Sequence, residues 1–210
     1  MRMTDIGTIL LRVLEHLGYT GLAVGAAALV ALPLGLLIGH TGRGTWTIGA
    51  ANALRALPSL GLMTLLVLLI GAGIVPPTIA LILLAIPPIL ANTAAGIAHA
   101  DPVTVDAARA MGMDERQVLA QVELPIALPL IVGGFRAAIL QVVATATIAA
   151  FVNLGGLGRF IFDGLALYDY GRVLLGAALV AGVALVLDGA LALVSRAVAP
   201  GRPSRRRATA

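Results

Sequence analysis

Three charged side chains lie inside otherwise apolar stretches of this 210-residue chain, and the chemistry that they predict is ion pairing. Arg55, Arg136 and Asp188 each lie about eight to ten residues from the end of a predicted membrane span, so roughly 12–15 Å deep at helical rise. A charge at that depth is costly unless it extends to the membrane surface or finds a partner. Arginine is long enough to extend part of the way, whereas aspartate is not. We therefore expect Asp188 to pair with Arg136 or, failing that, with Arg55.

The sequence offers few residues that could form a metal site, a nucleotide site or a nucleic-acid site. There is no cysteine, and the three histidines (His16, His40 and His99) are far apart, so we expect no metal site. All 14 basic residues are arginine, whereas a P-loop needs a lysine to reach the terminal phosphates of ATP. We expect no cofactor and no catalytic residue in this chain, and if ATP drives its activity, another polypeptide must bind the nucleotide. The net charge of +4 reflects four arginines near the C-terminus with no aromatic residue between them, which is not a nucleic-acid signal.

The elements that must position these charges are membrane helices. The chain is 60% hydrophobic and 11% charged, and about 25% charged residues is usual for a soluble domain. Such a composition predicts an all-α integral membrane protein with about five transmembrane helices. The apolar runs lie at 21–39, 47–72, 78–99, 126–151 and 173–198. Pro58 should kink the second of them, and Pro87 and Pro88 should kink the third.

The rest of the chain is assigned to flanking regions of this transmembrane domain. Residues 1–20 are expected to hold an amphipathic helix, over 4–18, that lies in the membrane interface. Residues 21–198 form the transmembrane domain and include a polar loop at 101–125. Residues 199–210 are expected to be a disordered basic tail on the cytoplasmic side.

The distribution of arginine predicts the orientation in the cytoplasmic membrane, since cytoplasmic loops carry the excess of basic residues. A cytoplasmic 101–125 loop places eight arginines inside: Arg43, Arg109, Arg116, Arg196, Arg202, Arg205, Arg206 and Arg207. Four then lie outside: Arg2, Arg12, Arg159 and Arg172. We therefore expect an external N-terminus, a cytoplasmic C-terminus and an odd number of spans.

The 101–125 loop carries signals for two short helices. Asp101 can cap a helix that starts at Pro102, runs to about Met111 and stops at Gly112. Asp114 can cap a second helix, with Gln117 as its capping-box partner. The simplest alternative is a solvated loop between two spans.

The spacing within this loop resembles the E-A-A-x-x-x-G-x(9)-I-x-L-P signature of the permease subunits of ABC importers. The matching positions are Asp106, Ala107, Ala108, Gly112, Val122, Leu124 and Pro125. Two of them depart from the signature, because Asp106 replaces glutamate and Val122 replaces isoleucine. Four further segments, ALRALPSLGLM, ILANTAAGI, ELPIALPLIVGGFRAAI and NLGGLG, are similar to the osmoprotectant branch of this family, which imports glycine betaine, carnitine or choline. Methionine and polar amino-acid permeases share the same core, so they stay as the alternative.

The resemblance implies a type I importer. Such an importer contains two permease subunits, identical or related, two cytoplasmic ATPase subunits that bind ATP and Mg, and an extracytoplasmic substrate-binding protein. It also implies that the helix Pro102–Met111 couples the permease to the ATPase. Val103, Ala107 and Met111 would form an apolar stripe, Ala107 and Ala108 would allow close approach, and Asp106 would pair with a basic residue of the ATPase.

Two further groups of residues receive roles in this interpretation. Gly112 would set the angle between the two short helices, while Leu124 and Pro125 would join them rigidly to the following span. An outer gate, or a docking surface for the binding protein, would be formed by Asn153, Gly155, Gly156, Gly158 and Arg159. An ordinary flexible turn is the alternative for that segment.

Two other classes of protein are compatible with the composition. An ion-coupled secondary transporter that acts alone needs carboxylates inside the membrane, and only Asp188 qualifies. A membrane scaffold without transport activity would have no evident use for Arg55, Arg136 and Asp188.

Overall fold

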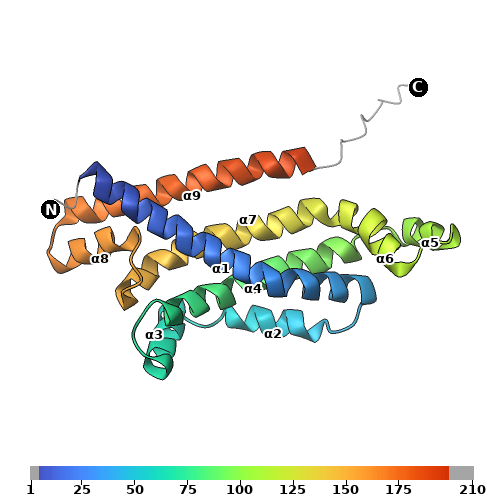
Figure 1. Ribbon diagram of the computed structural model, residues 1–210, viewed down its shortest axis with the longest axis horizontal. Helices are drawn as coiled ribbons and strands as arrows, with labels where there is room; N and C mark the ends of the chain where they lie inside the picture. The colour runs from blue at the N-terminus through green and yellow to red at the C-terminus, as the bar shows by residue number, and fades with distance from the viewer. Residues whose placement is uncertain (1–4, 199–210) are drawn as a thin grey trace, which may run out of the picture.

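The computed structural model describes residues 5–198, and these residues fold into helices joined by short connections (Figure 1). Four helical segments are long and apolar enough to cross a membrane: α1 (Ile6–Thr41), α4 (Val75–Ala98), the segment Glu115–Val152 that contains α7 (Leu124–Ala149), and α9 (Tyr170–Val198). A fifth is obtained if α2 (Trp46–Leu54) and α3 (Ser59–Ile70) form one bent span. The all-α membrane class is thus confirmed. The basic tail predicted at 199–210 lies outside the described residues.

The N-terminal helix and the first span, which we expected as separate elements, form the single 36-residue helix α1. The separation was wrong because Gly18 and Gly21 lower helix stability without removing any backbone hydrogen bond. Part of the polar face predicted for residues 4–18 is also turned inward, since His16 is fully buried. The placement of this end of α1 in the membrane interface stays a prediction.

The second predicted span is broken more sharply than a kink. α2 and α3 meet at 88°, and the break lies between Arg55 and Pro58. Proline disfavours helical backbone at the residue before it and cannot continue the hydrogen-bond ladder, so the chain changes direction there.

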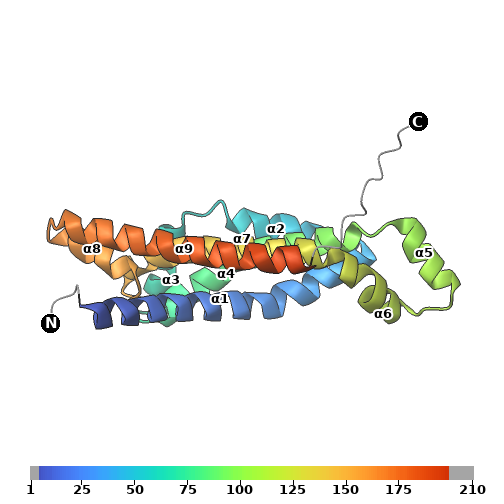
Figure 2. The same ribbon diagram turned by 90° about the horizontal axis from the view of Figure 1, so that it is seen from above.

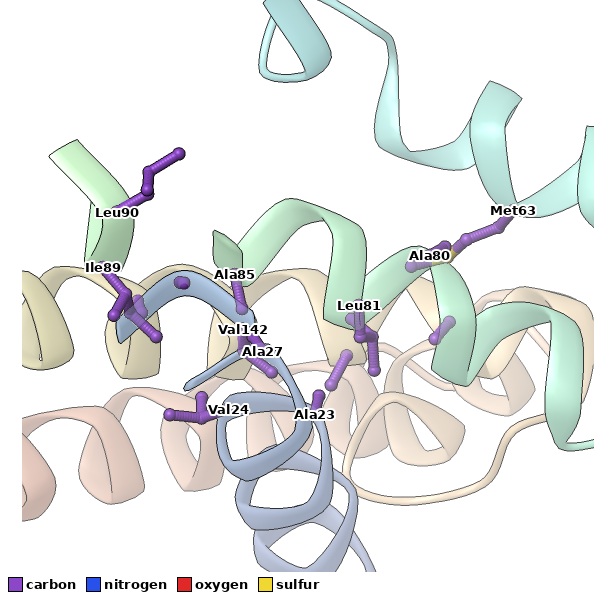
Figure 3. Packing of buried hydrophobic residues seen from close by; sticks show 14 of the residues in the cluster. Ala23, Val24, Ala27, Met63, Ala80, Leu81, Ala85, Ile89, Leu90 and Val142 are labelled. Carbon is purple, nitrogen blue, oxygen red and sulfur yellow. The ribbon is translucent and has the colours of Figure 1, made fainter. Parts of the chain in front are cut away.

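The core lies where α1, α4 and α7 pack against one another. Small side chains of α1, among them Ala23 and Ala27, meet Leu81 and Ala85 of α4 and Val142 of α7 (Figure 3). Alanine at these positions lets the backbones approach closely, which is how membrane helices gain van der Waals contact.

Pro87 and Pro88 lie inside the continuous helix α4. Pro88 has no N–H to donate, so the carbonyl oxygen of Leu84, four residues earlier, loses its helical partner. The side-chain amide of Gln141 in α7 donates to that oxygen at 3.2 Å. A neighbouring helix therefore satisfies the group that the proline leaves free, as the interior of a membrane requires.

Two groups of short helices lie at opposite ends of the long ones (Figures 1 and 2). α5 (Pro102–Ala110), α6 (Glu115–Gln117) and the π-helical segment η1 (Val118–Glu123) lie beyond the end of α4 and lead into α7. η2 (Ala150–Val152) and α8 (Gly158–Ala166) follow the far end of α7. α1 begins near α8 and ends near the 101–125 loop, so it runs the length of the molecule between the two groups.

Candidate functional site

The 101–125 loop is a built structure with the caps that its sequence predicts. The Asp101 side chain accepts a hydrogen bond from the Val103 N–H at 3.1 Å, at the start of α5. Asp114 and Gln117 form a complete capping box, with bonds of 2.8 and 2.9 Å. Gly112 has a φ of 89°, a left-handed conformation that side chains rarely adopt. The corner between α5 and α6 therefore depends on this glycine.

α5 presents an apolar stripe to its surroundings. Val103 and Met111 are 74% and 78% exposed, and Ala107 is exposed between them. Ala108, expected to face a partner as well, is only 2% exposed, and it packs with Val105 and Val118 inside the loop. That part of the prediction was wrong because Ala108 lies three residues after Val105, on the inner face of the helix.

Charged side chains surround the stripe. Arg109 donates two hydrogen bonds to Glu115, at 2.9 and 3.0 Å, and lies 3.4 Å from a carboxylate oxygen of Asp106. The hydrogen bond to Glu115 raises the pKa of Arg109 above its ordinary value, and the guanidinium stays charged. The Asp106 side chain is 76% exposed, so it can accept a hydrogen bond from a basic group of another chain.

The junction between the loop and α7 has a wider turn than an α-helix. Val122 and Glu123 belong to η1, and Leu124 and Pro125 open α7. The Leu124 N–H bonds back to the carbonyl of Leu119, five residues earlier. Single π-turns of this kind often occur at functional sites.

A contact that the sequence did not predict joins this junction to α1. Glu123 is only 5% exposed, and its carboxylate lies 2.7 Å from Nδ1 of His40, in the last turn of α1. The second ring nitrogen of His40, Nε2, lies 3.2 Å from the Glu115 carboxylate. Nothing in the sequence indicated this cluster, because His40 is 83 positions from Glu123 along the chain.

Inside the transmembrane region, the predicted pair of Arg136 and Asp188 is present. Arg136 Nε and Nη2 donate to the two carboxylate oxygens of Asp188 at 2.6 and 2.8 Å, and they join α7 to α9. Arg55 is exposed at the C-terminal end of α2 and makes no ion pair within residues 5–198. The structure therefore contains the first of the two expected pairings and not the second.

The segment 153–159 is held to neighbouring helices. Asn153 and Gly156 have φ values of 69° and 71°. The Gly156 N–H donates to the Glu15 carboxylate at 3.0 Å, and Arg12 bonds to that same carboxylate oxygen at 2.8 Å.

The remaining residues of that segment are fixed as well. Arg159 donates to the Asn153 side chain at 3.3 Å. Gly155 adopts a φ of 95°. Gly158 lies against the backbone of Thr147 with no room for a side chain. The segment is thus an ordered turn with a glycine-dependent backbone. The part played by Glu15 was missed because residues 4–18 were expected to lie in the membrane interface, apart from the other helices.

Comparison with known proteins agrees with this architecture. Residues 31–200 match the family described as binding-protein-dependent transport system inner membrane component. The choline transport system permease protein OpuBB of Bacillus subtilis is 36% identical over 203 residues, which cover 96% of this chain and 94% of the relative. The osmoprotectant import permease protein OsmW of Salmonella typhimurium is 36% identical over 180 residues, covering 83% and 84%. The carnitine transport permease protein OpuCB of Listeria monocytogenes is 35% identical over 193 residues, covering 91% and 88%.

Solved structures show the same fold. One chain of the MetNI methionine ABC transporter in an inward-facing conformation superposes with a TM-score of 0.84, over 95% of this chain and all of the other, at 22% identity. A chain of an amino acid ABC transporter superposes with a TM-score of 0.72 and 20% identity, over 90% of this chain and 93% of the other. At these identities the likeness describes the fold, which is that of type I ABC importer permeases. The chain is a multi-pass membrane permease subunit, and it belongs to the family of binding-protein-dependent transport system inner membrane components.

Proposed function

We propose that this chain is the permease through which an ATP-driven importer carries an osmoprotectant, such as glycine betaine, carnitine or choline, across the cytoplasmic membrane. The observation that supports this most directly is the identity of 33–36%, over 83–96% of the chain, to permeases named for osmoprotectant, choline, glycine betaine or carnitine transport. The solute would be handed over by a separate binding protein, since this chain has only eight aromatic residues with which to cage a quaternary ammonium group.

The complete importer would contain three further kinds of subunit. ATPase subunits would bind ATP and Mg, a second permease subunit would complete the pathway, and an extracytoplasmic protein would deliver the solute. The exposed stripe of Val103, Ala107 and Met111, with Asp106 beside it, has the apolar and charged character of a docking surface. We assign it to the ATPase.

Motion of the ATPase would reach the transmembrane helices through the 101–125 loop. Gly112 fixes the angle between α5 and α6, and Leu124 and Pro125 continue the loop directly into α7. A displacement of α5 would therefore turn or shift α7, and with it α4, which packs against α7. Rigid-body movement of this kind can alternate access to a central pathway.

The loop would face the cytoplasm, and the segment 153–159 would face the outside. This assignment rests on the excess of arginine at the loop end and on the position of the two groups of short helices at opposite ends of the molecule (Figure 2). Asn153, Gly155, Gly156, Gly158 and Arg159 would then form an outer gate or a docking surface for the binding protein.

The alternatives are less well supported. A methionine or polar amino-acid permease would share this fold, but the structural likeness at 20–22% identity carries no substrate information. A secondary transporter acting alone would need a carboxylate free to bind its coupling ion, whereas both carboxylate oxygens of Asp188 accept hydrogen bonds from Arg136.

Uptake into vesicles tests the proposal. The whole complex, with its ATPase and binding protein, would be reconstituted and supplied with labelled glycine betaine, carnitine, choline or methionine, with and without internal ATP. We expect ATP-dependent accumulation of at least one of the first three solutes and none of methionine. Accumulation of methionine alone would assign the chain to the other branch, and uptake by this chain without its partners would contradict the ATP-driven class.

A further inference from the structure

His40 joins two parts of the protein that are distant in sequence. It lies in the last turn of α1, and its ring contacts Glu123 of η1 through Nδ1 at 2.7 Å and Glu115 of α6 through Nε2 at 3.2 Å. The side chains of His40 and Glu123 are 14% and 6% exposed, so this contact is made largely out of water. The His40 imidazole therefore connects the end of α1 to α6, through Glu115, and to η1, through Glu123.

The contact with Glu123 satisfies a buried carboxylate. A buried charge is strongly destabilising unless a hydrogen-bond donor or an opposite charge lies beside it. Within residues 5–198, His40 is the only side chain that makes a hydrogen bond or ion pair with Glu123. The bridge between the end of α1 and η1 is therefore made by this one short hydrogen bond.

The bridge continues into α5. Glu115, which contacts His40, also accepts two hydrogen bonds from Arg109 of α5. A cavity of about 210 Å³, with His40, Glu123, Asp106 and Arg109 in its lining, separates α5 from the end of α1. The polar contacts of His40 with Glu115 and of Glu115 with Arg109 connect the end of α1 to α5 beside this cavity.

The other end of α1 makes a comparable contact. Glu15 accepts the Gly156 N–H at 3.0 Å, and His16 contacts the carbonyl of Val143 at 3.0 Å through Nε2. Glu15 and His40 are 25 residues apart in one helix, which corresponds to roughly 38 Å. α1 is therefore held by polar contacts both beside the 101–125 loop and beside the segment 153–159.

We propose that His40 is a positioning residue that makes α1 follow the 101–125 loop, so that α1 carries the loop's movement to the segment 153–159 at the opposite end. This route is separate from the covalent connection of the loop to α7. The inference rests on the proposed function in one respect, namely that an ATPase moves the loop. The short bond through Nδ1 to buried Glu123 is the principal link, and the contact of Nε2 with exposed Glu115 is the minor one.

Two substitutions separate these links. In His40→Asn the amide nitrogen can take the place of Nδ1, whereas in His40→Gln it reaches toward the place of Nε2. His99→Asn is the matched control, because the His99 side chain is exposed at the end of α4 and makes no hydrogen bond or ion pair among the described residues. Each variant would be assembled into the whole complex.

The first measurement is the amount of solute taken up per ATP hydrolysed. We expect His40→Gln to lower this ratio roughly tenfold, the factor associated with one charge-assisted hydrogen bond, while basal hydrolysis persists. His40→Asn and His99→Asn should stay close to the native ratio. A native ratio in His40→Gln, or equal losses in His40→Asn and His40→Gln, would overturn the proposal.

The second measurement needs no transported solute. Hydrogen exchange of residues 153–158 would be followed with and without ATP, and we expect an ATP-dependent change in the native complex that is lost in His40→Gln and kept in His40→Asn. An identical response in both variants would overturn the proposal even if uptake had established the function. A clear response in a complex that transports none of the tested solutes would leave the inference standing while the proposed substrate class fails.

If the His40→Gln variant does not assemble into the complex, a covalent bridge between positions 40 and 123 provides a separate test. The chain has no cysteine of its own, so His40→Cys combined with Glu123→Cys provides one unique pair for a short bifunctional thiol reagent. We expect the unbridged double variant to be uncoupled and the bridged one to recover the ratio of uptake to hydrolysis. Loss of activity on bridging would show that α1 must move relative to η1, which contradicts the proposal.

Discussion

Arg136 and Asp188 face each other across α7 and α9 with two parallel hydrogen bonds, of 2.6 and 2.8 Å. Among residues 5–198, α9 has one buried residue, Gly176, so few of its side chains are enclosed by the other helices. A bidentate arginine–carboxylate pair is directional, so it restrains both the rotation of α9 about its axis and its position along that axis. We conclude that this pair fixes α9 against α7, in addition to the close contact of Gly176 with Phe160 and Ile161 of α8.

Replacing Asp188 with asparagine should therefore loosen α9. Asp188→Asn leaves the Arg136 guanidinium inside the membrane region without its counter-charge, and we expect the melting temperature of the purified chain to fall by roughly 3–10 °C. Exchange of the two residues, Asp188→Arg with Arg136→Asp, should recover part of the loss. Arg55→Ala is the control, since Arg55 is exposed and has no ion pair among the described residues, and it should melt within about 2 °C of the native chain. Equal effects of Asp188→Asn and Arg55→Ala would argue against a structural pair.

Gly112 should tolerate few side chains. Its φ of 89° costs an ordinary L-residue about 1–2 kcal/mol, whereas asparagine adopts left-handed conformations more readily. We expect Gly112→Leu to abolish the stimulation of ATP hydrolysis by the loaded binding protein, and Gly112→Asn to retain a substantial part of it. Both variants should insert into the membrane normally. Full stimulation in Gly112→Leu would show that the angle between α5 and α6 is unimportant for coupling.

Asp106 should act through its charge at the exposed edge of α5. Asp106→Lys places a positive charge beside Arg109 and repels any basic partner, so we expect stimulated ATP hydrolysis to fall roughly tenfold or more. Asp106→Glu restores the residue type of the family signature and should behave like the native chain. Because Asp106 is exposed, both variants should keep the native melting temperature. Normal stimulation in Asp106→Lys would exclude a basic partner at this position.

The contact of Gln141 with Leu84 can be tested by a double-mutant cycle. Gln141→Leu leaves the Leu84 carbonyl without a partner, and hydrogen bonds between membrane helices contribute about 0.6 kcal/mol on average. In Pro88→Ala, the new backbone N–H can satisfy that carbonyl within α4 itself. We therefore expect Gln141→Leu to destabilise the native chain in thermal unfolding and to have little effect in the Pro88→Ala background. The same loss in both backgrounds would mean that Gln141 acts through packing.

Local chemistry accounts for the features that the sequence predicted correctly. The caps at Asp101 and Asp114, the corner at Gly112 and the position of the bend at Pro58 each depend on a few consecutive residues, so a single sequence is sufficient to recognise them. The size of that bend was underestimated, since α2 and α3 meet at 88°. The pairing of Arg136 with Asp188 was also predictable, because few charges lie at that depth and aspartate cannot reach water by itself.

The features that were missed all depend on which face of a helix meets another helix. Residues 4–18 were expected to lie in the membrane interface, whereas Glu15 and His16 contact the segment 153–158 and α7. Ala108 was assigned to a partner and lies inside the loop. The contact of His40 with Glu123 spans 83 positions, and no local pattern marks either residue. Such pairings follow from the packing of α1 against α4 and α7, which periodicity alone does not specify.

Close packing at Gly158 provides a final prediction about the segment 153–159. A Cβ atom at Gly158 would collide with the carbonyl oxygen of Thr147 and lie 2.7 Å from Ala150 Cβ, and backbone atoms cannot rotate away as side chains do. Overpacking of this kind costs about 1–3 kcal/mol, so we expect Gly158→Ala to lower the melting temperature and to speed hydrogen exchange at residues 153–158.

Gly133→Ala is the matched control, because a Cβ at Gly133, inside α7, meets no atom within 4 Å. Alanine there should be neutral or stabilising by up to about 1 kcal/mol, since glycine is the poorer helix former. If both substitutions gave the same melting temperature and exchange rates, α8 would have to shift freely against α7, and the segment would be a flexible turn after all.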